Sequence, residues 1–375
     1  MPDMTRSTRF STNRQRGFTL VELMVGLLLG MLTVLVISQV LSVAEGMKRS
    51  TSSGSDAQVN GALALYTLQS DIQMAGYGAT ASTDALGCLV KRQFDAGGTA
   101  FTFPLAPVVI TDGASGAPDT ITVLQGRTSG FSAPMILTED HPKTTAYFTV
   151  ASTLGAVANN MMIAVPKVQG VNAWCTLFNV TNDASATDTT LTTTRLPHAA
   201  GAAGKWNQSS IFPDAGYLSG SYLLNMGSMV YRTYSVDSAN NLSVTDLSPT
   251  TGGANTQELF PQIVNLQAMY GKDTNNDGVV DTYDTVLPTT NAGWLQVLAI
   301  RVAVVARSGQ YEKEEVTPVA PQWDVGATGT ISGTTTCNAT SKCIALKVDN
   351  LTDWKHYRYK VYDTVIPLRN MLWNS

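Results

Sequence analysis

The chain has little charge and few of the side chains that carry out catalysis. Only 14% of its 375 residues are Asp, Glu, Lys or Arg, and it contains three histidines. These histidines, His141, His198 and His356, lie far apart and belong to no HExxH pattern, so each is predicted to be a surface residue. The sequence also has no GxSxG elbow, no P-loop and no dinucleotide-binding glycine motif after a strand. These absences argue against an enzyme.

The charge balance also argues against a nucleic-acid partner. The formal net charge is −4, whereas proteins that bind nucleic acid neutralise its phosphates with clustered Lys and Arg. Thr, Ser, Ala and Gly are plentiful, and short runs rich in Val, Ile, Thr and Tyr recur along the chain. This composition is typical of a β-rich domain outside the cytoplasm.

One long stretch near the N-terminus lacks charge altogether. The 22 residues from Leu23 to Ala44 contain no Asp, Glu, Lys or Arg, and a helix of that length spans about 33 Å, enough to cross a hydrocarbon core of about 30 Å. The residues before it include one acid, Asp3, and four arginines, Arg6, Arg9, Arg14 and Arg16. Because positive charge favours the cytoplasmic side, we predict a single pass with a cytoplasmic N-terminus and a periplasmic C-terminal domain.

The start of this stretch has a specific pattern. Arg16 and Gly17 precede the apolar residues, Phe18 follows at once, and one carboxylate, Glu22, lies five residues after the glycine. An acid at the edge of a membrane span is energetically costly, so it is a functional-site hypothesis by default. The pattern resembles the N-terminal signal of type IV prepilins and pseudopilins. The alternative is a plain membrane anchor with a stray glutamate.

The resemblance implies how the N-terminus is processed. In that family a membrane peptidase cuts after the glycine, here between Gly17 and Phe18, and methylates the new amino terminus, here on Phe18. Because an ordinary secretory signal is cut after its apolar stretch, this helix would instead stay on the mature protein. Glu22 is then expected to neutralise the Phe18 ammonium of an adjacent subunit during assembly, since an unpaired charge in an apolar filament core is costly.

Helical periodicity continues beyond the predicted span. Leu65, Leu68 and Ile72 recur at helical spacing. We predict one long helix, loosened around residues 46–54, that ends near Ala75 at a glycine-rich stop signal.

Both ends of the chain resemble a narrower family. Residues 68–78, in which Asp71 precedes an Ala-Gly-Tyr-Gly turn, resemble the end of the first helix in PilW-type minor pilins. The strands predicted at residues 294–309 and 354–370 resemble the same family. The middle of the chain, roughly residues 80–255, shows no such likeness.

The remainder of the chain is predicted to be β-rich. Strand-like runs occur at residues 101–110, 119–126, 146–150, 161–165, 228–236, 262–271, 294–309 and 354–370. Residues 181–210 are polar and rich in Thr, Ala and Gly, and we predict a long surface loop there. The expected fold class is α+β and pilin-like: a long N-terminal α-helix packed on a large antiparallel β-rich domain.

The predicted organisation has four parts. Residues 1–17 form the prepilin leader and residues 18–44 the transmembrane or filament-core helix. Residues 45–78 form the second half of the helix and its turn, and residues 79–375 form the periplasmic β-rich domain.

The chain has four cysteines, Cys88, Cys175, Cys337 and Cys343. An even number in a translocated domain favours disulfides, and four cysteines allow three pairings. Cys337 and Cys343 enclose only five residues, so they form the easiest closure, which leaves Cys88 with Cys175. A zinc site is the alternative, although no CxxC spacing or nearby histidine supports it.

Residues 273–284 have the spacing of a calcium-binding loop. Oxygen ligands occur at the first, third, fifth and ninth positions, and Gly278 provides the sharp turn at the sixth. The expected calcium ligands are Asp273, Asn275, Asp277, Val279 through its carbonyl, Asp281 and Asp284. Position 12 is an aspartate instead of a glutamate, and the flanking residues are predicted strands instead of EF-hand helices. The alternative is a solvated turn.

The resemblance implies a minor pilin of the type IV pilus that primes pilus assembly and lies at the tip. Its implied partners are other minor pilins, the major pilin, the prepilin peptidase, the inner-membrane assembly platform and a tip adhesin. Two alternatives stay open: a minor pseudopilin of a type II secretion system, and a calcium-dependent pilus-tip adhesin.

Overall fold

The computed structural model describes residues 17–128, 132–170, 172–327, 335–337 and 341–372. The predicted α+β class, with a long N-terminal helix and a large antiparallel β-rich domain, is confirmed. The chain divides into two units between Ser52 and Ser53. The four arginines of the predicted leader lie outside the described residues.

Helix α1 runs from Leu20 to Met74 and is continuous, so the predicted loosening at residues 46–54 does not interrupt it. In the first unit, every side chain from residue 17 to residue 48 is exposed. The segment Leu20–Lys48 is long and apolar enough to cross a membrane. A helix that is apolar all round is suited to lipid or to other apolar helices.

The part of α1 in the second unit is amphipathic. Ala64, Leu68 and Ile72 lie on one face and are fully buried. Gly61 lies on the same face, where a Cβ atom would be 2.6 Å from Cδ2 of Tyr362 and 3.0 Å from Cβ of Ala306. The absence of a side chain at this position therefore allows the helix backbone to approach the sheet closely.

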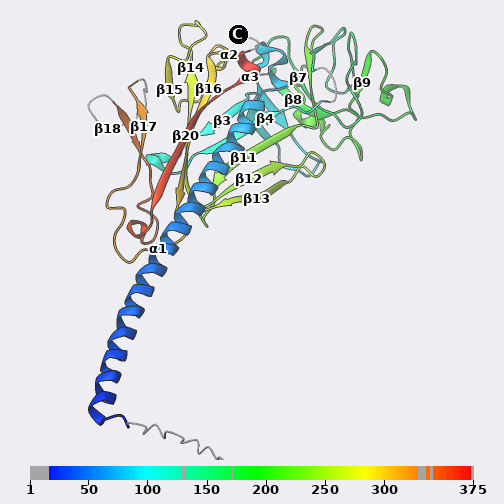
Figure 1. Ribbon diagram of the computed structural model, residues 1–375. Coiled ribbons are helices and arrows are strands. Elements are labelled where there is room, and N and C mark those ends of the chain that lie inside the picture. The colour runs from blue at the N-terminus through cyan, green and yellow to red at the C-terminus, as the bar shows by residue number, and fades with distance from the viewer. Residues whose placement is uncertain (1–16, 129–131, 171, 328–334, 338–340, 373–375) are drawn as a thin grey trace, which may run out of the picture. The chain divides into compact units, whose positions relative to one another are not determined.

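Two antiparallel sheets share one core with this part of α1 (Figure 1). One has the order β15-β14-β16-β20, formed by Thr282–Asp284, Ile263–Lys272, Val297–Arg307 and Tyr359–Pro367. The other has the order β13-β12-β11-β4-β3, formed by Ala254–Pro261, Asn241–Leu247, Val230–Val236, Thr120–Gln125 and Val108–Thr111. Strand β16 is a nearly continuous apolar run and is buried on both faces, which suits such a sandwiched position.

A six-stranded sheet carries two further cores, one on each face. Its order is β2-β1-β8-β7-β10-β5, formed by Phe101–Pro104, Leu89–Arg92, Cys175–Asn179, Met161–Val165, Tyr222–Gly227 and Met135–Ile136. All five residues of β7 are buried. Met161 and Ile163 contribute to one core, while Met162 and Ala164 contribute to the other, as the two-residue period of a strand requires.

Smaller elements complete the second unit. Strands β6 (Tyr147–Thr149) and β9 (Arg195–Pro197) pair with each other, and β17 (Gln322–Gly326), β19 (Lys342–Ala345) and β18 (Thr335–Thr336) form a small sheet. The short helices are α2 (Asn291–Leu295), α3 (Arg369–Leu372) and six 3-10 turns, Ala79–Ala81, Thr83–Ala85, Ala114–Gly116, Thr187–Thr189, Ser209–Ile211 and Trp354–His356.

Four of the predicted elements differ from the structure. The predicted strand 354–370 is shorter, because a 3-10 turn at Trp354–His356 precedes β20 and α3 begins at Arg369. The run 101–110 is split into β2 and β3 around Pro107, which has no N–H to donate to a ladder. The predicted strand 294–309 begins later, because Thr290 caps a short helix by accepting a hydrogen bond from the Gly293 backbone N–H. The predicted loop 181–210 contains β9, whose Leu196 is fully buried.

Candidate functional sites: the N-terminal segment and the anchored helix end

The predicted processing residues lie at the start of α1. Thr19 is followed three residues later by Glu22, and their side chains form a reciprocal cap. Oε2 of Glu22 accepts hydrogen bonds from the Thr19 backbone N–H and hydroxyl, both at 3.0 Å, and the Thr19 hydroxyl accepts from the Glu22 N–H at 3.3 Å. Both bonds to the carboxylate end on Oε2, and a carboxylate has a second oxygen that can accept a further bond.

This cap leaves the predicted cleavage point accessible. Gly17 and Phe18 precede the helix, and the Phe18 side chain is 87% exposed. A carboxylate in the first turn also lies at the positive end of the helix dipole. The geometry therefore presents an exposed Gly-Phe junction next to a negatively charged helix start.

The four cysteines form two disulfides. Cys88 is bonded to Cys175 and Cys337 to Cys343, the pairing that the short 337–343 loop favoured. The first disulfide is buried and joins the start of β8 to the residue before β1. It therefore fastens the parallel pair of strands in the six-stranded sheet, in which Val90 is opposite Cys175.

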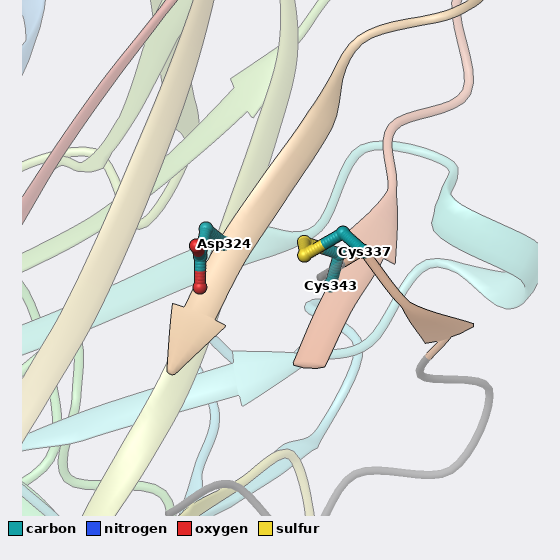
Figure 2. A group of neighbouring side chains, drawn as sticks. All are labelled: Asp324, Cys337 and Cys343. Atoms are coloured by element: carbon teal, nitrogen blue, oxygen red, sulfur yellow. A yellow bond between two sulfur atoms is a disulfide. The ribbon is translucent and has the colours of Figure 1, made fainter. Parts of the chain in front are cut away.

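The second disulfide accounts for the one metal-like group among the described residues. Asp324, Cys337 and Cys343 are close enough to share an ion (Figure 2). Both sulfur atoms are bonded to each other, so neither is a thiolate that could bind zinc. Asp324 lies opposite Cys343 in the β17–β19 ladder, which explains its proximity.

The predicted calcium loop forms the hairpin between β14 and β15. Asp273 is buried, and its carboxylate accepts hydrogen bonds from the backbone N–H groups of Asn276 at 2.6 Å and Gly278 at 2.7 Å. The Asn275 amide donates to Asp277 at 3.2 Å and to Asp281 at 3.3 Å. Four of the expected ligands are thus held on one tight turn, and a cavity of about 480 Å³ opens beside Asp273 and Asp277.

The last expected calcium ligand has another partner. Asp284 lies in β15, and its carboxylate is 2.7 Å from Nζ of Lys272 and accepts the Val286 backbone N–H at 2.9 Å. The side chains of Lys272 and Asp284 are 12% and 17% exposed. Asp284 therefore closes the hairpin as half of an ion pair.

The end of α1 is anchored to the sheet by a charged network. Oδ2 of Asp71 accepts hydrogen bonds from Nη1 of Arg232 at 3.0 Å and from the hydroxyl of Tyr234 at 2.6 Å. Nε of Arg232 donates to Asp246 at 2.6 Å. One arginine on β11 thus joins an acid of the helix to an acid of β12, and the tyrosine adds a second bond to the helix.

Electrostatics favour the charged state of this network. Burial opposes the charge of Arg232, but its hydrogen bonds to Asp71 and Asp246 outweigh that effect and raise its pKa. Burial and the bond to the Asp71 carboxylate raise the pKa of Tyr234. The tyrosine therefore stays a neutral donor.

The prediction of three surface histidines is wrong for two of them. His141 and His198 are 3% and 4% exposed and lie in an aromatic core, whereas His356 is half-buried. Their separation of 57 residues hides the pair from any local sequence pattern.

Comparison with protein families identifies both ends of the chain. Residues 12–38 match the prokaryotic N-terminal methylation motif, which contains Gly17, Phe18 and Glu22. Residues 231–370 match the family described as type IV pilus-assembly protein W, PilW. Together, the two matches support a type IV pilin-like minor pilin of the PilW type. No curated protein and no solved structure matches it.

The PilW match covers a little over a third of the chain and begins within β11. It includes Arg232, Tyr234 and Asp246, the sheet side of the helix anchor. Together with the apolar segment Leu20–Lys48, the methylation motif fits a single-pass, membrane-anchored pilin. Proteins of this kind are structural parts of an assembly.

Proposed function

We propose that this PilW-type protein is a minor pilin that primes assembly of the type IV pilus and lies at its tip. The observation that carries the proposal is the presence, on one chain, of the methylation motif at residues 12–38 and the pilus-assembly match at residues 231–370. Before assembly, the second unit would lie in the periplasm, where an oxidising environment suits both disulfides.

The size of the chain supports a place at the tip. Residues 79–230 lie outside both matches and build the six-stranded sheet with its two cores. A subunit repeated along a filament must fit between neighbours on all sides, whereas a subunit at the end has free space above it. The added sheet is therefore more easily accommodated at a tip.

Helix α1 supplies the surface on which subunits would assemble. On the second unit, Val59, Leu63, Tyr66 and Met74 are between 46% and 68% exposed and follow the spacing of one helix face. Large apolar side chains gathered on one exposed face favour contact with another apolar surface. We infer that this stripe is a packing surface for another subunit.

Glu22 would act as the electrostatic contact of assembly. Once the chain is cut after Gly17, Phe18 carries a terminal ammonium, and Glu22 of an adjacent subunit would neutralise it. To make this contact, Glu22 would give up one of its hydrogen bonds to Thr19. Its carboxylate is already held at the helix start, so the contact adds no further negative charge to the apolar surroundings.

Substitution in the full chain separates processing from assembly. Glu22→Ala should leave cleavage intact and reduce incorporation into pili, whereas Gly17→Ala should leave a larger, uncut precursor. Glu45→Ala is the matched control, because Glu45 is an exposed glutamate on the same helix. Normal surface piliation by Glu22→Ala in a strain that lacks the native copy would contradict the assembly role.

A minor pseudopilin of a type II secretion system is the principal alternative. The two roles share the N-terminal signal, so deletion of the chain separates them. Loss of surface pili with normal protein secretion supports the pilus. Loss of secretion with normal pili would support the secretion system.

As a second proposal, residues 273–281 bind calcium, and the chain acts as a calcium-dependent adhesin at the pilus tip. We propose Asp273, Asn275, Asp277, the Val279 carbonyl and Asp281 as ligands, without Asp284, which pairs with Lys272. Such a site would have the affinity of extracellular modules, about 10⁻⁴ to 10⁻³ M.

Titration calorimetry with Ca²⁺ on the full chain in detergent tests the calcium site. Heat should appear with the native chain and be lost in the double substitution of Asp273 and Asp277 by Ala. Lys342→Ala on β19 provides a control that leaves the hairpin unchanged. Absence of heat from the native chain would exclude the site, and adhesion that needs no Ca²⁺ would exclude the calcium-dependent adhesin.

A further inference from the structure

Two histidines meet inside the aromatic core on one face of the six-stranded sheet. Nε2 of His141 lies 2.8 Å from Nε2 of His198, a hydrogen-bond distance. The His141 ring stacks on Phe148 with 3.9 Å between centroids, and the His198 ring stacks on Phe212 at 5.0 Å. Phe178 packs edge-on against His198. The pair is thus enclosed by hydrocarbon.

The histidine pair joins the segments that cover this core. The His141 backbone N–H and C=O both bond to Tyr217, at 2.7 and 2.9 Å. The His198 N–H bonds to the Ala146 C=O at 2.7 Å, at the end of the β6–β9 ladder. We call β6, β9 and the two histidines the cover. The contact between the two imidazoles therefore connects the β6–β9 ladder with the segment that contains Tyr217, and it helps to hold the cover on the sheet.

The hydrogen bond requires two neutral rings with different tautomers at the facing Nε2 atoms. One Nε2 must carry a proton and the other a lone pair. Nδ1 of His141 is buried without a partner among the described residues. An unpaired N–H costs more than an unpaired acceptor, so His141 carries its proton on Nε2 and donates to His198, whose proton is then on Nδ1.

Acid disrupts this arrangement in two steps. A first added proton can go to Nδ1 of His141, which places a charged N–H in an apolar core. The backbone groups of Thr145 and His141 favour this charge, but the cost of burial outweighs them. A second proton puts N–H groups on both facing Nε2 atoms, and two donors cannot share a contact of 2.8 Å. The cover must then open so that water can reach the rings.

The neighbouring charged groups do not compensate such a proton. Asp140, next to His141, accepts the Ser219 N–H, while Lys143 pairs with Asp214 on the Phe212–Tyr217 segment. Arg195 on β9 pairs with Asp188.

The other titratable groups beside the cover are one exposed acid and two tyrosines. Tyr147 lies in β6, and burial raises the pKa of Tyr217 so that this ring stays neutral. Glu139 is an exposed residue. The Tyr217 hydroxyl donates to the Thr176 hydroxyl at 2.7 Å and lies 3.1 Å from the Trp174 C=O.

We propose that His141 and His198 form a proton-operated latch that keeps the cover closed at neutral pH and releases it in acid. The direction of the expected pKa changes agrees with the geometry. Burial lowers the pKa of His141 from 6.5 to about 4. Burial and the neighbouring His141 lower the pKa of His198 well below its usual value.

The sign of the pH effect follows from proton binding. Between the two pKa values the open state binds more protons than the closed state, so closure is favoured above about pH 6.5 and lost as the pH falls. For a histidine whose pKa drops from 6.5 to about 4, the opening equilibrium rises about 30-fold at pH 5 relative to high pH. The two histidines together multiply this factor.

Hydrogen exchange on the full chain in detergent micelles tests the latch. Exchange rates of β6 and β9 are compared with those of β14 and β16 at about pH 7 and about pH 5, after correction for intrinsic rates. We expect protection of β6 and β9 to fall at least ten-fold more than that of β14 and β16. The double variant His141→Gln and His198→Gln keeps a donor and an acceptor without titrating, so its two regions should lose protection equally.

Nitrogen chemical shifts of labelled histidine in the native chain provide a test that requires no variant to fold. His141 should show a proton on Nε2 and His198 on Nδ1, and neither should titrate between about pH 8 and about pH 5.5 while the cover is closed. Titration of either ring near pH 6.5 with β6 and β9 still protected would overturn the proposal. The same selective loss of protection in the glutamine variant would also overturn it.

Discussion

The network around Asp71 leads to a ranked set of stability changes. In Asp71→Ala, Arg232 keeps Asp246, but the hydroxyl of Tyr234, a residue only 1% exposed, loses its partner. An unsatisfied buried hydroxyl costs about 1–3 kcal/mol. Because the Arg232 side chain is 27% exposed, its lost ion pair adds at most about 1 kcal/mol. We therefore expect the free energy of unfolding to fall by about 1–4 kcal/mol.

The other members of the network should contribute less. Asp246→Ala leaves Arg232 bonded to Asp71 and should cost below about 1 kcal/mol. Tyr234→Phe removes the donor together with its need for a partner, so we expect about 1 kcal/mol. In the Tyr234→Phe background, Asp71→Ala should then cost about 1 kcal/mol less than in the native chain, which is the signature of a direct contact.

Thermal denaturation of the full chain in detergent measures these changes. For a chain of this size, each kcal/mol lowers the midpoint by about 2–4 °C or less. Asp56→Ala is the matched control, since Asp56 is an exposed acid on the same helix. If Asp71→Ala lowers the midpoint no more than Asp56→Ala does, or if the double variant is additive, the anchoring role is refuted.

Two further perturbations test other parts of the second unit. Replacing Cys88 and Cys175 by Ser opens a loop with a sequence separation of 87, whereas replacing Cys337 and Cys343 opens one with a separation of 6. Chain entropy predicts that the free energy of unfolding falls by about 4.5 kcal/mol in the first double variant and about 2.4 kcal/mol in the second. Equal denaturation midpoints for the two double variants would contradict this order. Burial raises the pKa of Asp119 to about 7, so the folded chain holds an extra proton and its stability should fall as the pH rises from about 4 to about 7. Asp119→Asn should remove this pH dependence. It should also lower the denaturation midpoint at every pH, because an amide N–H would face the Gly113 or Ala268 backbone N–H. An unchanged dependence of stability on pH in this variant would count against the assignment to Asp119.

Sequence patterns predicted the elements whose signals are local. The charge-free stretch and its apolar continuation predicted one helix to about Ala75, and it ends at Met74. The run 161–165 predicted β7 with the same bounds. Both depend on neighbouring residues alone: one on helical hydrophobicity over many turns, the other on a short apolar run between polar loops.

Contacts between distant residues could not be predicted in this way. The bond between Asp71 and Arg232 spans 161 residues, and no spacing in the sequence indicates it. Likewise, His198 follows a Thr-rich stretch that predicts a loop, yet Leu196 two residues earlier is fully buried and lies opposite Phe148 of β6. The composition of residues 181–210 is polar on average, so it does not indicate that the short strand β9 within them reaches the core.

The calcium loop shows the same limit within a single motif. The spacing of its first nine positions is readable in the sequence, and the structure places these residues on one turn. The fate of Asp284 depends instead on strand register. Tyr270 is opposite Asp284 and Lys272 is opposite Thr282, so the lysine lies diagonal to the acid and reaches it. Only the paired strands reveal that the twelfth position forms an ion pair.

The PilW match contains most of the strands that share a core with α1. The buried face of the helix packs with β11, β12, β14, β16 and β20, which overlap or lie within residues 231–370, and with β3 and β4, which lie before them. Changes in the matched strands would disturb the packing of this helix. The six-stranded sheet has its own two cores, built mainly by residues before 231. It can therefore change in sequence as long as its cores stay filled, and the histidine latch belongs to this freer part.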